Sequence, residues 1–334
     1  MKSLIRYRYR YRYLWRRAAL MGAAVLLCAA APGLAHAAKA VTLASADVSA
    51  AQAEAAGPTD LQVGIYDPDG AFADASRVQI EHVFMPWQNI DLASLDVADR
   101  YAADRGRTLL LTVEPWSWSP LEPVFPDELR EGLLSGRYDD RIGELCGRIA
   151  KLRSPVTVRW AHEMDLKNGR YPWSDWRPSD YVAAYRHFVD LCREKAPDLT
   201  FMWSPRGEFD LGLYYPGDDY VDEIGLSVFG YQAYDQVANG HERDLTELLK
   251  PSYDRAVKFG KPIYISEFGC AGDVAYMERC NDFSAATLKQ FPLLEGVVYY
   301  SAVEPGQWPA VYGKPDWRVV PGSGPGSGLL AGPN

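Results

Sequence analysis

The sequence predicts an α/β fold with one (β/α)8 TIM barrel over residues 59–318. Eight short, mainly apolar runs recur along this segment, which is the pattern of parallel strands buried on both faces. Amphipathic patterns of helical period lie between several runs, and the segment has the usual length of one barrel, roughly 250 residues. An open doubly wound sheet is the alternative, but no glycine-rich phosphate loop follows the first run.

The order of the runs along the chain predicts right-handed βαβ units. The clearest helices are expected at 138–152, 178–195 and 245–259. The first repeats apolar residues at helical spacing, and the second begins at Pro178, a residue that suits the first turn of a helix. The eight strands are expected at 61–66, 80–85, 108–113, 156–161, 200–203, 223–228, 262–266 and 296–300.

Residues 1–37 have the three parts of a signal peptide. A basic start is followed by an uncharged run, 18–34, and then by an Ala-His-Ala cleavage site that ends at Ala37. We therefore expect a secreted or periplasmic protein without stable membrane insertion after cleavage, and a retained N-terminal anchor is the alternative. Residues 38–58 are expected to be a flexible linker, and 319–334, rich in Gly, Pro and Ser, a disordered tail.

Charge and composition narrow the range of partners. The formal net charge is −9, and loss of the basic leader would make the chain more acidic, so nucleic acid and anionic membranes are unfavourable partners. The chain holds 10 Trp and 21 Tyr, whose rings stack on sugars as well as pack in cores. No His-rich cluster or cofactor motif is present, so we expect no metal and no cofactor. Many barrels of this size act alone, which favours a monomer.

Four cysteines would remain in the exported chain, and an even number permits disulfides in an oxidising compartment. Three connectivities are possible. Cys270–Cys280 is the favoured pair because it would close a short loop. Cys146 and Cys192 each lie in a helical pattern and could simply be buried thiols.

Two glutamates follow expected strands at the end where barrel enzymes keep their active sites. Glu163 follows the fourth strand and Glu267 follows the seventh, and these strands lie on facing sides of a closed barrel. A retaining glycosidase needs one carboxyl as proton donor and a second as nucleophile, roughly 5–5.5 Å apart. We expect Glu163 to be the acid/base, with a raised pKa, and Glu267 to be the ionised nucleophile.

The segments around these glutamates resemble those of family 26 glycoside hydrolases. The resemblance covers most of 61–312 and implies a (β/α)8 barrel with retaining chemistry. Members of the family are mostly endo-β-1,4-mannanases, with some mixed-linkage β-glucanases and β-1,3-xylanases. The matching blocks are His162-Glu163-Met164, Tyr171-Pro172-Trp173, Trp203-Ser204-Pro205, Tyr215-Pro216-Gly217-Asp218 and Ser266-Glu267-Phe268-Gly269.

The resemblance also implies roles for residues near the glutamates. His162 matches a histidine of the sugar site, and Trp173 matches an aromatic beside the −1 or +1 sugar. Tyr231 matches a tyrosine that hydrogen-bonds the nucleophile, although Tyr234 is close by. The tryptophans of the expected upper loops are candidate sugar platforms without a firm match: Trp87, Trp116, Trp118, Trp176 and Trp308.

Two departures from the family pattern concern the identity of the sugar. Asp165 stands in an insertion after His-Glu-Met, and Arg206 follows Trp-Ser-Pro, where asparagine is common. The expected function is a retaining endo-β-glycanase whose partner is a polysaccharide, with β-1,4-mannan favoured. Mixed-linkage β-glucan or an exopolysaccharide comes next. The alternative of another class is a non-catalytic protein that binds polysaccharide during export.

Overall fold

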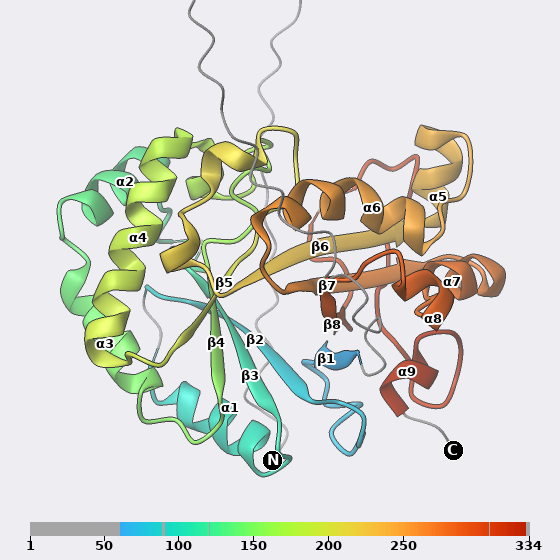
Figure 1. Ribbon diagram of the computed structural model, residues 1–334, viewed down its shortest axis with the longest axis horizontal. Helices are drawn as coiled ribbons and strands as arrows, with labels where there is room; N and C mark the ends of the chain where they lie inside the picture. The colour runs from blue at the N-terminus through green and yellow to red at the C-terminus, as the bar shows by residue number, and fades with distance from the viewer. Residues whose placement is uncertain (1–60, 89–90, 120, 307, 332–334) are drawn as a thin grey trace, which may run out of the picture. The chain divides into compact units, whose positions relative to one another are not determined.

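The computed structural model describes residues 61–88, 91–119, 121–306 and 308–331. Its eight strands are all parallel and close into a barrel in chain order, with β1 paired to β8 (Figure 1). This confirms the predicted (β/α)8 fold. The strands are β1 (Gln62–Tyr66), β2 (Ile80–Pro86), β3 (Thr108–Glu114), β4 (Val156–Trp160), β5 (Thr200–Trp203), β6 (Glu223–Tyr231), β7 (Ile263–Ala271) and β8 (Leu294–Tyr300).

The helices surround the barrel, as Figure 1 shows for α2, α3 and α4 on one side and α6, α7 and α8 on the other. Among the described residues, no helix is long and apolar enough to cross a membrane. The expected signal peptide and linker lie outside the described residues. The helices are α1 (Ser94–Ala103), α2 (Pro126–Leu134), α3 (Asp139–Ile149), α4 (Pro178–Lys195), α5 (Gln232–Tyr234), α6 (Leu245–Ala256), α7 (Val274–Cys280), α8 (Ala285–Leu288) and α9 (Ser327–Ala331).

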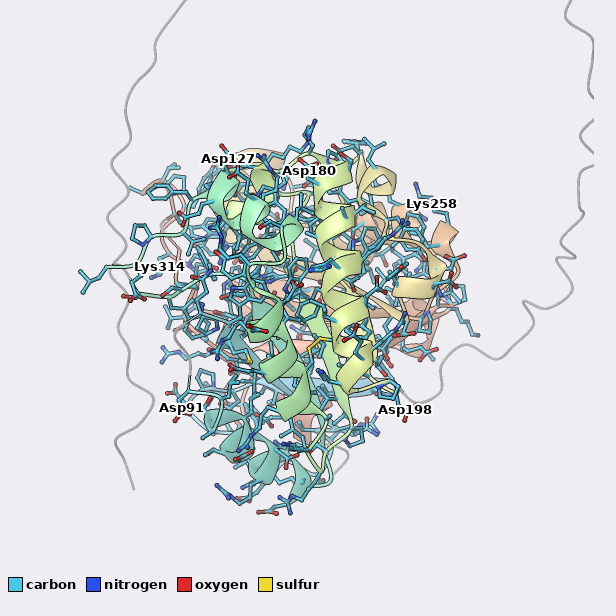
Figure 2. All side chains as sticks on the ribbon, turned by 90° about the vertical axis from the view of Figure 1, so that its left-hand side faces the viewer. Asp91, Asp127, Asp180, Asp198, Lys258 and Lys314 are labelled. Carbon is cyan, nitrogen blue, oxygen red and sulfur yellow. A yellow bond between two sulfur atoms is a disulfide. The ribbon has the colours of Figure 1, made fainter. Side chains whose placement is uncertain are left out.

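Local signals explain where the main helices begin. Pro178 is the first residue of α4, where its missing N–H costs nothing. The helix α6 has a capping box in which the Asp244 carboxylate accepts the N–H of Glu247, and the Glu247 carboxylate accepts the N–H of Asp244. On the outside of the barrel, Figure 2 shows charged side chains such as Asp127 and Asp180, at the starts of α2 and α4. Arg130 lies between these two carboxylates.

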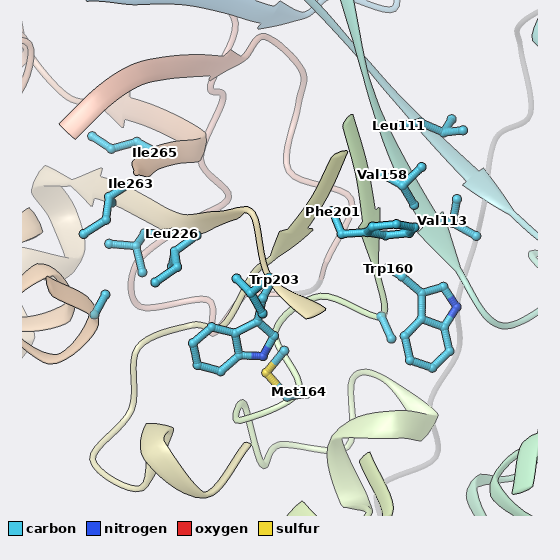
Figure 3. Close-up of a cluster of buried hydrophobic side chains, with 14 of the residues drawn as sticks. Leu111, Val113, Val158, Trp160, Met164, Phe201, Trp203, Leu226, Ile263 and Ile265 are labelled. Carbon is cyan, nitrogen blue, oxygen red and sulfur yellow. The ribbon is translucent and has the colours of Figure 1, made fainter. Parts of the chain in front are cut away.

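The core has two parts because alternate residues of a strand face opposite sides of the sheet. Outward residues pack beneath the helices, and Figure 3 shows this cluster with Val158 and Trp160 of β4 beside Phe201 and Trp203 of β5. Inward residues form a smaller apolar layer inside the barrel. This layer consists of Ile80, Leu110, Met202, Tyr264 and Val298.

Strands β6 and β7 are longer than predicted because they keep pairing with each other as far as Tyr231 and Ala271. A register shift lies in this ladder: Leu226 pairs with Ile265, but Ser227 pairs with Glu267, so β7 holds one extra residue, Ser266. Glu267 therefore lies within β7 and not after its end. The bulge allows two consecutive residues of β7 to contribute to the barrel interior.

The end of the described chain differs from the expected disordered tail. Residues 319–331 contain an isolated bridge between Val320 and Ser323 and the short helix α9. Leu330 is fully buried in the main hydrophobic cluster, and α9 contacts β1. The prediction of disorder was wrong for these residues because the Leu329–Leu330 pair supplies an apolar anchor that the Gly/Pro/Ser-rich composition hides.

Two disulfides are present among the described residues. Cys270–Cys280 is the favoured pair of the sequence analysis. Cys146 and Cys192 are not free buried thiols, because they form the second disulfide and join α3 to α4 (Figure 2). The two helices lie side by side, which brings residues 46 positions apart into bonding distance.

The disulfide between α3 and α4 should stabilise the barrel measurably. We expect the double variant Cys146→Ser/Cys192→Ser to lose about 2–4 kcal/mol of unfolding free energy, because the bridge closes a long loop in the unfolded chain. Urea denaturation followed by circular dichroism would measure this loss. Cys270→Ser/Cys280→Ser is the control and should lose about 1 kcal/mol less, since its loop is shorter. An equal or larger loss in the control would contradict the expectation.

Candidate active site

A polar layer fills the barrel directly above its apolar layer. It lies two residues further along the strands, so it faces the same interior. His82 donates or accepts a hydrogen bond with Thr112 at 2.7 Å, and Arg159 donates to Ser204 at 2.7 Å and to Thr112 at 3.2 Å. The Ser204 hydroxyl lies 3.2 Å from that of Ser266. This network forms the floor of the site and fixes Arg159, which is fully buried.

Glu163 is held by an unusual backbone turn after β4. Ala161 and Glu163 have φ angles of 46° and 52°, and these are the non-glycine residues with positive φ among those described. Such a conformation costs roughly 1–3 kcal/mol and persists where the surroundings impose it. Here the N–H of Glu163 donates to the carbonyl of Ser204 at 2.7 Å. The turn presents a buried glutamate at the mouth of the barrel, and backbone strain of this kind is common at functional sites.

Glu267 forms an ion pair with Arg159, whose Nη2 lies 2.8 Å from the Glu267 Oε1. The Nε2 of His162 lies 4.0 Å from the same oxygen and 3.0 Å from the hydroxyl of Tyr171. Glu163 and Glu267 lie close enough for the charge of Glu163 to raise the pKa of Glu267. The structure thus brings together the two predicted glutamates and His162.

The pKa order of the two glutamates is the reverse of the one expected from the sequence. Burial raises the pKa of Glu267 to about 7, and the nearby Glu163 adds to the shift while Arg159 opposes it. Burial also acts to raise the pKa of Glu163, but the charges of Arg206 and Arg170 outweigh it and lower that pKa below its ordinary value. In the free site the two carboxyls therefore titrate as a coupled pair, which loses its last proton near pH 7.

This order sets the sign of the pH dependence. The reactive form needs one proton on the pair, held by Glu163, with Glu267 ionised. That form belongs to the singly protonated pair, which loses its last proton as the pH rises through about 7. We therefore expect kcat/KM to fall above an apparent pKa near 7, as measured by initial rates across pH. A kcat/KM that rises through pH 7 would contradict this proton count.

Several predicted sugar contacts are packing residues instead. Trp173 is fully buried, stacks on Tyr171 and donates its indole N–H to the carbonyl of His162 at 2.7 Å, so it positions His162 and does not touch sugar. Trp87 is 1% exposed and packs against Trp160 beneath the helices. Trp176 is also buried. These three interpretations were wrong because the upper loops fold back onto the helices.

Tyr231 does not hydrogen-bond the nucleophile. It ends β6, and its hydroxyl donates to the carbonyl of Tyr312, in the segment after β8. Its ring is half-buried and lies edge-on to the half-buried Trp308, at 5.3 Å between centroids. Tyr231 and Trp308 thus form a partly exposed aromatic surface, and the role of Trp308 as a platform stays a prediction.

On the β3 side, Trp116 is also partly exposed and donates its indole N–H to Glu114 at 3.0 Å.

Sequence reasoning did not single out two charged residues of the site. Arg159 holds Glu267, and the alternation of buried apolar and polar residues in β4 could have placed it inward. Glu304, in the segment after β8, accepts the indole N–H of Trp317 at 3.1 Å and lies 3.9 Å from Arg170.

Within the described ranges, no group of three or more His, Cys, Asp or Glu side chains is arranged to hold a metal ion.

The chain is similar in sequence to several polysaccharide hydrolases. A β-1,3-xylanase of Vibrio sp is 31% identical over 109 residues, which are 30% of this chain and 23% of that protein. A mannan endo-1,4-β-mannosidase of Bifidobacterium adolescentis is 30% identical over 176 residues, 46% of this chain and 17% of that protein. The chain thus spans about a fifth of the length of these curated relatives.

Solved structures support the fold. A GH26 β-mannanase from Bacteroides ovatus superimposes with a TM-score of 0.54 at 17% identity, covering 84% of this chain and 87% of that one. GH26C from Muricauda sp. MAR_2010_75 gives a TM-score of 0.58 at 16% identity, covering 81% and 84%. The model of glycosyl hydrolase family 26 matches residues 124–283, a segment that includes both glutamates of the site. This part of the chain is therefore similar to glycosyl hydrolase family 26.

Proposed function

We propose that this protein is a retaining glycoside hydrolase that cleaves a β-linked polysaccharide, with β-1,4-mannan as the favoured substrate. The observation that carries the proposal is the pair of buried glutamates from β4 and β7, one of them ion-paired to a buried arginine. Two carboxyls of opposite protonation at one glycosidic bond are the requirement of retaining chemistry. The match of residues 124–283 to glycosyl hydrolase family 26 supports the same reaction.

The first step forms a glycosyl ester on Glu267. The Glu267 carboxylate attacks the anomeric carbon while Glu163 donates its proton to the glycosidic oxygen, so the leaving chain departs as an alcohol. Arg159 contacts Glu267 and balances its charge when it loses its proton. The coupled pair enters the reaction with one proton, which must lie on Glu163 while Glu267 is ionised.

The second step releases the sugar with retention. Glu163, now ionised, takes a proton from water, and the resulting hydroxide attacks the same anomeric carbon and frees Glu267. His162 precedes Glu163 in the sequence, and its Nε2 lies 4.0 Å from Glu267. Tyr171 bonds its ring and Trp173 bonds its backbone carbonyl. This arrangement fixes the imidazole where it can orient the sugar in the −1 position.

A panel of polymers tests both reaction and substrate. The purified protein and its Glu267→Ala variant would be incubated with galactomannan, glucomannan, lichenan, β-1,3-xylan and cellulose, and new reducing ends measured. We expect release from the mannans by the parent only. Release from lichenan or β-1,3-xylan instead would keep the reaction and change the substrate. A β-1,3-xylanase and an endoglucanase are among the proteins that the chain resembles. Binding without release from any polymer by either protein would favour a non-catalytic polysaccharide-binding role.

We further propose that the protein acts outside the cytoplasm. The basic and apolar leader is typical of exported proteins, and the two disulfides suit an oxidising compartment. Cell fractionation with antibody detection would test this. Recovery of the reduced protein in the cytoplasm would contradict it.

A further inference from the structure

We propose that Arg206 and Arg170 form an anion-binding subsite beside Glu163, on the side of the leaving group, and that it takes the carboxylate of a uronic acid in the glycan. The preferred substrate would then be an acidic β-glycan and not a neutral one. This inference rests on the proposed function and names its substrate class.

The backbone places Arg206 next to the acid/base. Arg206 lies in the loop after β5, two residues beyond Ser204, whose carbonyl accepts the N–H of Glu163 at 2.7 Å. The loop is fixed by Asp165, which accepts the N–H of Arg206 at 2.6 Å and those of Gly207 and Glu208 at 2.8 Å each. A cation held on so well-supported a loop is preorganised for a ligand.

The charge of the Arg206 guanidinium acts on Glu163 without a direct contact between the two side chains. Among the residues that the structure describes, no hydrogen bond or ion pair joins this side chain to another, although it is only partly exposed. Glu163 is the carboxylate on which the charge of Arg206 acts, while Asp165 accepts three backbone N–H groups and Glu267 pairs with Arg159. A half-buried guanidinium with free N–H donors favours an anionic ligand, and its fork matches a carboxylate.

Arg170 supplies the second cation. It lies in the loop after β4, with its guanidinium over the ring of Tyr171 at 5.3 Å, and its ion-pair partner is Glu304 at a loose 3.9 Å. A neutral polysaccharide offers hydroxyls, which do not need two arginines in addition to Arg159. The chain as a whole is acidic, with a net charge of −9, so two arginines beside the acid/base differ from the general charge of the molecule.

The charges also indicate the side of the scissile bond. Arg206 exerts the largest effect of any charge on Glu163, whereas the charges that act most on Glu267 are those of Arg159, Glu163 and Arg170. Arg206 is therefore on the Glu163 side of the pair. Because the acid donates its proton to the leaving oxygen, a group beside it faces the +1 sugar.

A bound carboxylate would also favour catalysis. Arg206 and Arg170 lower the pKa of Glu163 in the free site, and Arg159 and Glu267 are the other charged groups that face it. A substrate carboxylate between the two arginines would neutralise them and raise that pKa, which favours the protonated form of Glu163. Acidic sugars would thus be bound and activated by the same contact.

Matched polymers provide the test. Galactomannan, glucomannan and lichenan would each be compared with a copy partly oxidised at C6, which differs only in carrying uronates. We expect kcat/KM of the parent to be about tenfold higher on the oxidised copy, corresponding to one ion pair in a partly buried site. Arg206→Gln should abolish this preference in kcat/KM, Arg206→Lys should keep part of it, and ionic strength of about 1 M should weaken it.

Arg100→Gln is the matched control, because Arg100 is exposed on α1, whose end leads into the N-terminal end of β3, opposite the site. This variant should keep the parent's preference. Equal kcat/KM on neutral and oxidised copies, or the same ratio in Arg206→Gln as in the parent, would overturn the inference and leave the hydrolase proposal standing. Calorimetry of the oxidised polymers with Glu267→Ala measures binding without hydrolysis, and it distinguishes failure of the hydrolase proposal from failure of the subsite proposal. Tight binding that depends on Arg206, with no turnover by the parent, would support the subsite and refute the hydrolase.

Discussion

Replacing Glu267 by alanine is expected to reduce polysaccharide hydrolysis by at least about 10⁴-fold, because no glycosyl ester can form without the nucleophile. The loss should lie in kcat, since Glu267 acts on the anomeric carbon in the transition state and the rest of the groove is unchanged. Initial rates of reducing-end release on the best polymer would measure it. The same change leaves Arg159 buried without its partner, which costs about 3–5 kcal/mol of stability.

Two controls separate chemistry from folding. Glu267→Gln keeps the shape of the side chain and an oxygen for Arg159, so it should be better folded than Glu267→Ala and equally inactive. Azide added to Glu267→Ala should restore turnover of an aryl glycoside and give a product of inverted anomeric configuration, because the anion enters from the vacated side. An azide product of retained configuration would show that Glu267 is not the nucleophile.

The parts of this molecule that could be predicted are those that depend on the pattern of apolar residues within a few positions of the sequence. The eight strands are mainly apolar runs because both of their faces are buried, and this pattern located each strand to within a few residues. Glu163 and Glu267 could be found because each follows or lies near the end of such a run. The bulge at Ser266, which sets the direction of Glu267, depends on pairing with β6 and leaves no local signal.

Contacts between distant loops could not be predicted. Tyr231 was expected at the nucleophile, yet its hydroxyl binds the carbonyl of Tyr312, 81 residues away. Trp87 was a candidate platform and Trp173 was matched to an aromatic beside the −1 or +1 sugar, but whether a tryptophan in a loop faces the groove or the core depends on how that loop folds back. The charges around Glu163 come from loops after β4 and β5, so the reversed pKa order was invisible in the sequence.

Removal of the other glutamate should have an effect that depends on the leaving group. We expect Glu163→Ala to lower kcat/KM on the polymer by about 10²–10⁴-fold, because a sugar alkoxide leaves poorly without a proton. On a dinitrophenyl glycoside, whose leaving group needs no proton, formation of the glycosyl ester should slow by less than about tenfold. Stopped-flow release of dinitrophenol would measure that step. Added azide should accelerate turnover and give a product of retained configuration.

The same variant should invert the pH dependence. In the parent, activity falls above about pH 7 because the pair loses its only proton. In Glu163→Ala only Glu267 titrates, and it must be ionised to attack, so kcat/KM on the activated substrate should rise with pH to a plateau. The midpoint should lie below 7, since the negative charge of Glu163 raises the pKa of Glu267 in the parent and is absent in the variant. A profile that still falls above pH 7 would mean that another residue supplies the proton, and Glu163 would no longer be the acid.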